Sequence, residues 1–99
     1  MLLRERDTAK GVLVSVCDED CLGETYEDGD ISLAVTEEFY AGEEAINADP
    51  ETVIDALQGA TVGNLVGAES VSVAVDAGLI DEERVLDVDG IAHAQLLWI

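Results

Sequence analysis

The chain has 99 residues, enough for one domain with a modest core. Its 23 Asp and Glu face only four Lys and Arg, for a formal net charge of −19, although 48% of the residues are apolar. This balance excludes a disordered acidic tail, which has too few apolar residues to bury, and it predicts a single domain over residues 1–99 with a packed core under a negative surface.

The charge also suggests an environment. Charges of one sign repel across a screening length of about 8 Å at physiological ionic strength, which shrinks to about 3 Å in molar salt. We therefore expect a cytoplasmic protein of a salt-accumulating organism; the alternative is an acidic protein that binds a basic partner. No stretch is long and apolar enough to span a membrane, and no apolar signal segment follows Met1 to Arg4.

In chain order, an N-terminal hairpin is predicted first, because residues 2–6 can pair with the alternating residues 12–17. Residues 18–23 indicate a turn or a single helical turn closed by glycine, and residues 27–30 an acidic loop. Residues 31–36 alternate again and predict a third strand. The pattern is weak from residue 37 to 48, where Phe39 and Tyr40 are expected to anchor the segment to the core.

A helix is predicted next, because Asp49 can cap it, Pro50 suits its first position and Gly59 can end it. Residues 61–67 indicate a short strand or a tight loop. Residues 68–77 fit either a strand or a helix that ends at a glycine, and periodicity alone slightly favours the strand.

The C-terminal part predicts a helical turn from Asp81 and then a hairpin, in which residues 84–88 and 91–99 are joined by Asp89 and Gly90. The expected fold class is α+β, a small single domain with a mixed or antiparallel sheet of about five strands and two main helices.

Four stretches together resemble the archaeal family known only as domain of unknown function 424, in its haloarchaeal form: Cys17-Asp18-Glu19 with Leu22-Gly23, residues 37–43, residues 60–67 and residues 90–95. The resemblance implies a helix for residues 68–77 and implies no activity. Ala92 stands where the family pattern has proline, which puts the rigidity of the last turn in question.

His93, the one histidine, would share a strand face with Gln95, about 6.5–7 Å away. An imidazole beside an amide could hold a carbonyl or a phosphate, or act as a general base; the alternative is a half-buried structural histidine. Cys17 and Cys21 with His93 offer only three zinc ligands, whereas a structural zinc site has four, so we expect no metal and no cofactor.

The acidic run from Asp18 fails as an EF-hand, because Leu22 occupies its fifth position. Asn64 lies where backbone donors at a helix start could bind an anion, but no P-loop residues follow, and bonding to the neighbouring strand and capping of the next helix are the favoured alternative. Tyr40 and Trp98 are expected in packing rather than in base stacking. The candidate binding residues are Cys17, Asp18, Tyr40, Asn64, His93 and Gln95.

Two functions remain open. The first is a noncatalytic module that docks on a protein or ribonucleoprotein, of which the translation apparatus is an example; the second is a small enzyme with a cleft formed by Cys17, Asn64, His93 and Gln95. Direct nucleic-acid binding is disfavoured, because bases cluster only at Arg4, Arg6 and Lys10. The apolar residues 96–99 would favour a homodimer through a sheet edge.

Overall fold

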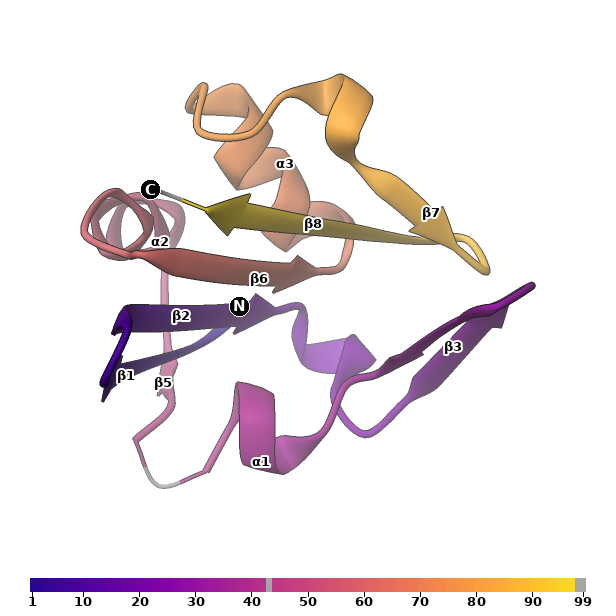
Figure 1. The fold of residues 1–99 in the computed structure, drawn as a ribbon, viewed down its shortest axis with the longest axis horizontal. Coiled ribbons are helices and arrows are strands. Elements are labelled where there is room, and N and C mark those ends of the chain that lie inside the picture. Colours follow the sequence, from indigo (N-terminus) through magenta and orange to yellow (C-terminus); the bar gives the residue numbers. More distant parts are fainter. Residues whose placement is uncertain (43, 98–99) are drawn as a thin grey trace.

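A six-stranded mixed sheet forms the centre of the protein, whose computed structural model describes residues 1–42 and 44–97 (Figure 1). Only β2 and β6 are parallel, and the other pairs are antiparallel. The strand order is β5-β1-β2-β6-β8-β7, with the bounds β1 Leu2–Thr8, β2 Gly11–Cys17, β5 Ile46–Asn47, β6 Val62–Val66, β7 Leu86–Val88 and β8 Ile91–Leu97.

Two helices, α2 (Pro50–Gln58) and α3 (Ala68–Asp76), cover one face of this sheet (Figure 1). As predicted, Asp49 caps α2 by accepting a hydrogen bond from the Thr52 amide, and Pro50 occupies the first turn. The main core lies between these helices and the sheet, and its fully buried side chains include Val14, Val16, Val53, Leu57 and Leu65. The α+β class with two main helices is confirmed.

Part of the opposite face is covered by shorter elements. These are the 3-10 turn η1 (Glu19–Cys21), the short helix α1 (Glu37–Tyr40) and a hairpin of β3 (Thr25–Asp28) and β4 (Ile31–Ala34). They enclose a second apolar cluster, whose buried members are Cys17, Cys21, Val35, Tyr40 and Val66. A further 3-10 turn, η2 (Glu82–Arg84), precedes β7 where the sequence predicted a helical turn.

Two predictions in the first half need correction. The strand predicted at residues 31–36 exists as β4, but it pairs only with β3 in a separate two-stranded sheet, which projects beyond the main sheet (Figure 1). The acidic loop predicted for residues 27–30 is partly strand, because Glu27 and Asp28 pair with Ser32 and Ile31. The predicted mixed sheet of about five strands is confirmed; it has six strands, of which the two-residue β5 lies at one edge.

The second half agrees with the family-based reading. Residues 68–76 are helix, and the hairpin of β7 and β8 turns at Asp89 and Gly90. Ala92 lies within β8 and pairs with Asp87, so the strand is continuous through this position.

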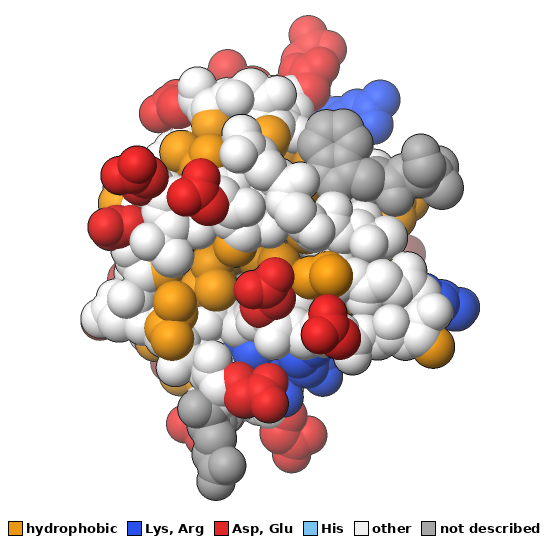
Figure 2. All heavy atoms as spheres, turned by 90° about the vertical axis from the view of Figure 1, so that its left-hand side faces the viewer, with side chains coloured by type: hydrophobic (Ala, Val, Ile, Leu, Met, Phe, Trp, Pro, Cys, Tyr) orange, Lys and Arg blue, Asp and Glu red, His pale blue; other side chains and the backbone are white. Residues whose placement is uncertain are grey.

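On the face that Figure 2 shows, carboxylates are scattered, and apolar side chains are visible between them. Among the described residues, none of the helices is long and apolar enough to cross a membrane.

Candidate functional site

A row of polar residues crosses the sheet on the face opposite α2 and α3. The strand register aligns Arg4 with Ser15, Ser15 with Asn64, and Asn64 with Gln95. Side chains on one face alternate along each strand, so these four point the same way, while Val14 and Leu65 point into the main core. Three of the strands involved are far apart in sequence, and the sheet register alone brings the row together.

At the outer end of the row, two amides bind each other. Gln95 Nε2 donates a hydrogen bond of 2.9 Å to Asn64 Oδ1. Asn64 is only 9% exposed, whereas Gln95 is exposed and can present its remaining polar atoms to a ligand. Next to Asn64 within the row, the buried Ser15 Oγ has no hydrogen-bond partner among the described residues.

His93 lies beside this pair, two residues before Gln95 in β8. Its Nδ1 is 3.0 Å from the carbonyl oxygen of Leu65. Because a carbonyl only accepts, Nδ1 carries the hydrogen, and in the neutral ring Nε2 is then the free acceptor. The predicted shared face of His93 and Gln95 is confirmed by a hollow of about 220 Å³ that both of them line.

A second hollow of about 300 Å³ adjoins the first and shares Arg84 and Gln95 with it. We call the two together the β8 groove; its lining residues are Leu79, Ile80, Asp81, Arg84, Leu86 and the β8 residues His93 to Leu97. The groove exists because β7 begins only at Leu86, which pairs with His93. The residues before Leu86, including η2, lie outside the sheet and leave the rest of β8 without a partner on this side in the described part of the chain.

Cys17 and Tyr40 lie away from this groove, inside the second apolar cluster. Cys17 is fully buried, and this burial raises the pKa of its thiol to about 11, with Cys21 and Asp18 adding to the rise. Burial likewise raises the pKa of Tyr40 to about 12. Neither side chain is available to a ligand in this arrangement.

The three candidate zinc ligands do not converge. Cys17 and His93 are both register partners of Val66, one on each side of it, so they stand two strand spacings apart, about 10 Å. Both cysteines are free thiols. This strand spacing also bears on catalysis by Cys17 and His93. A nucleophile and its base must lie within hydrogen-bond reach of each other, and the backbones of these two residues are two strand spacings apart.

Asp18 has a structural task at the start of α3. Its Oδ2 accepts from the Glu69 amide at 3.1 Å, and its Oδ1 accepts from the Ser70 amide at 2.8 Å and the Ser70 hydroxyl at 2.7 Å. The approach is close, since a Cβ on Gly67 would lie 2.3 Å from the Asp18 Cγ. The helix start considered as an anion site therefore already holds a carboxylate of the chain itself.

This arrangement corrects the prediction that Asn64 caps the helix. Asn64 does bond the neighbouring strand, through Gln95, as the same alternative proposed. The cap comes instead from Asp18, about fifty residues earlier in the chain than its partners Glu69 and Ser70.

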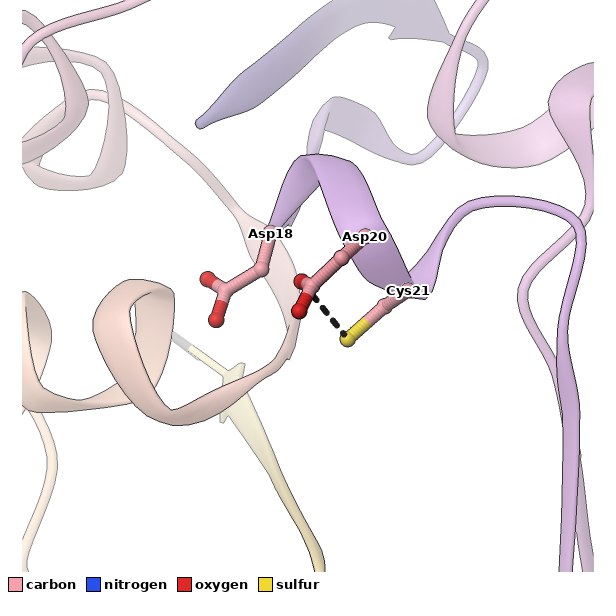
Figure 3. Close-up of side chains that lie close together, drawn as sticks. All are labelled: Asp18, Asp20 and Cys21. Carbon is pink, nitrogen blue, oxygen red and sulfur yellow. Dashed lines mark hydrogen bonds between the residues drawn. The ribbon is translucent and has the colours of Figure 1, made fainter.

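Asp18 also belongs to a small cluster with Asp20 and Cys21 (Figure 3), whose potential ligand atoms lie within 4.8 Å of one another. Both Asp18 oxygens are engaged with α3, however, and the buried Cys21 thiol donates to Asp20. Desolvation raises the pKa of the Cys21 thiol and so disfavours the thiolate that a metal needs. The cluster is explained by its own contacts.

Of the groove residues, sequence reasoning named His93 and Gln95 as binding candidates and residues 96–99 as an apolar edge, but it did not single out Arg84 or Leu86 for binding. Arg84 carried one signal, since it is the only base after Lys10. Leu86 and Leu97 carried another that only the structure reveals, because they are 49% and 62% exposed despite being apolar. Trp98, predicted to pack in the core or at the rim, lies outside the described residues.

The fold and the site define a small α+β domain with one open, partly apolar sheet edge and no assembled catalytic group among the described residues. The chain belongs to the DUF424 family, a family of proteins of unknown function, which it matches over residues 5–99. No curated protein is significantly similar to it.

One solved structure shows the same fold. It is an uncharacterized conserved protein from Methanopyrus kandleri, 30% identical, with a TM-score of 0.75. The alignment covers 99% of this chain and 93% of the other.

Proposed function

We propose that this protein is a noncatalytic binding module that docks on another protein, alone or within a ribonucleoprotein, through the β8 groove. The observation that carries the proposal is the composition of this groove. Exposed Leu86 and Leu97 supply apolar contact area, and Arg84, His93 and Gln95 supply hydrogen-bonding groups beside it. Such a mixture is typical of transient protein interfaces.

The competing enzyme hypothesis loses its nucleophile. Cys17 is buried with a raised pKa, and Ser15 is aligned with Asn64 rather than with His93. Because no nucleophile contacts a base among the described candidate residues, the site does not support covalent catalysis, and its amides and imidazole favour binding of a group.

A protein partner also fits better than direct binding to nucleic acid. Two of the three N-terminal bases hold α1 on the sheet: Arg4 donates to the Glu38 carbonyl, and the Arg6 guanidinium lies 5.3 Å from the centre of the Phe39 ring. Contacts to phosphates would have to use the same groups, on a surface that is otherwise negative.

We further propose that the protein works in the cytoplasm of a salt-accumulating archaeon. The net charge of −19 on so small a body supports this, because molar cations screen the repulsion between neighbouring carboxylates. Chemical unfolding by urea, measured in dilute buffer and in molar KCl, tests it. Stability should rise steeply with KCl; an unchanged unfolding midpoint would leave the acidity to be explained by a basic partner.

Docking through the groove is tested with a matched pair of substitutions. Gln95→Arg places a long cation in the groove, and Gln58→Arg makes the same change on the exposed end of α2. In affinity capture from a lysate in molar KCl, the wild type and Gln58→Arg should retain the same partner in a fixed ratio, and Gln95→Arg should lose it. Equal retention by both variants would move docking elsewhere, and a monomer that captures nothing would contradict the binding module.

A further inference from the structure

The outer edge of β8 is unpaired where the groove lies. The Gly67 amide donates to the Ala92 carbonyl across the junction of β6 and β8. Backbone groups of an antiparallel strand face alternate sides, so those of Ala94 and Leu96 also face β6, and those of Gln95 and Leu97 face outward. Because β7 ends its pairing at His93, no strand among the described residues meets the outward groups of Gln95 and Leu97.

The opposite edge of the sheet is built differently. β5 pairs only with Leu2 and Leu3, and the part of β1 beyond this pairing contains the charged run Arg4 to Asp7. Charged side chains along an edge are a common protection against the addition of another strand. The β8 edge lacks this protection, because its residues there are neutral and Leu97 is 62% exposed.

The charges around the groove indicate what can bind. Asp81 lines the groove, and the exposed Glu82 and Glu83 follow it in the chain, so that three carboxylates form an acidic border beside the single guanidinium of Arg84. A second copy of this chain, also at −19, would bring like charges together at this border. An extended segment with Lys or Arg beside apolar residues would instead pair with the carboxylates and cover Leu97, and contact ion pairs survive in molar salt better than long-range attraction does.

We propose that the free edge of β8 at Gln95 and Leu97 accepts an extended, basic segment of another protein as an additional strand. This inference rests on the proposed docking function and specifies its mode, in which main-chain hydrogen bonds provide affinity and alternate side chains provide selectivity. Arg84, which lines both hollows of the groove, can donate to carbonyl groups of the added strand.

The test uses a fluorescent synthetic peptide of alternating lysine and valine, capped at both ends, and a control peptide N-methylated at every residue. The control has the same side chains and charges but has no amide hydrogen to donate on either edge, so it cannot form the ladder with β8. The protein variants are Leu97→Pro, which removes an outward amide and no bond to β6, and Leu97→Val, which keeps that amide. Circular dichroism establishes that both variants are folded.

We expect the peptide to bind the wild type and Leu97→Val in molar KCl, and affinity to fall by at least about tenfold with either the methylated peptide or Leu97→Pro. Equal binding of both peptides, loss of all binding in molar KCl, or no effect of Leu97→Pro would overturn strand addition. If sedimentation shows a dimer that Leu97→Pro dissociates, the edge binds a second copy and the proposal is wrong.

These outcomes are separate from those of the docking test. Capture of a partner that Gln95→Arg abolishes, together with failure of the peptide, would leave docking through the groove in place and remove only strand addition. Failure of the capture experiment with success of the peptide would leave the β8 edge able to accept a strand and would contradict docking of a natural partner there.

Discussion

Replacing Asp18 by alanine should destabilise the protein more than any other single change to its acidic residues. The Asp18 carboxylate accepts three hydrogen bonds from the first turn of α3, at 3.1, 2.8 and 2.7 Å. An N-terminal cap contributes about 0.5–2 kcal/mol, and hydrogen bonds to a charged group about 1.5–3 kcal/mol. Since the three bonds share one carboxylate and overlap with the cap, their sum overestimates the effect, and we expect a loss of about 2–3 kcal/mol.

The matched control is Asp20→Ala, two residues along in the same acidic turn. The Asp20 carboxylate accepts a weak hydrogen bond from the neighbouring Cys21 thiol, with 3.9 Å between Sγ and Oδ1. Because both substitutions remove one negative charge from nearly the same place, their difference isolates the cap from the relief of general repulsion. Asp20→Ala should change stability by less than about 0.5 kcal/mol.

Urea unfolding in molar KCl, followed by circular dichroism, measures the difference. A loss of 2 kcal/mol corresponds to a fall in Tm of about 8–16 °C for a domain of this size. Asp18→Asn keeps one acceptor oxygen and should lie between the wild type and Asp18→Ala. If Asp18→Ala and Asp20→Ala unfold at the same urea concentration, the assignment of Asp18 as the cap of α3 is wrong.

Three further results are expected. Gly67→Ala should destabilise by at least as much as Asp18→Ala, because Gly67 has a φ of 107° and its Cβ would meet Asp18; a urea midpoint equal to that of the wild type would contradict this. A thiol reagent at about pH 8 should leave native Cys17 unmodified and label it only in urea, since its pKa is near 11. The free energy of unfolding should fall as the pH rises from 9.0, the ordinary thiol pKa, to about 11, because the Cys17 thiol loses its proton at lower pH in the unfolded chain than in the folded protein. Cys17→Ala should weaken this fall. If the wild type and Cys17→Ala have the same dependence of stability on pH, the raised pKa of Cys17 is refuted.

The sequence predicted the elements that are defined by local signals. Asp49 and Pro50 predicted the start of α2, and Asp89 with Gly90 predicted the turn of the last hairpin, because caps and turns depend on neighbouring residues. β3 was missed for the converse reason. Its residues, Thr25 to Asp28, are mostly exposed and show no apolar alternation, since the strand pairs only with β4.

The candidate site was predictable only in part. His93 and Gln95 share a face because they are two residues apart on one strand, and that much follows from the sequence. Their relation to Asn64, and the cap that Asp18 supplies to α3, depend on how β2, β6 and β8 are ordered in the sheet. No local pattern encodes that order. The groove itself arises because β7 pairs with β8 only from Ile91 to His93 and leaves the following residues of β8 without a partner on that side within the described residues.

Amide hydrogen exchange of the free protein in molar KCl, measured by NMR, tests the open edge of β8 most directly. The amides of Ala94 and Leu96, which face β6, should be protected, and those of Gln95 and Leu97 should exchange nearly as fast as in a loop. Protection of Gln95 and Leu97 equal to that of Ala94 and Leu96 would show that the edge is already paired, and the docking surface described for this protein would be wrong.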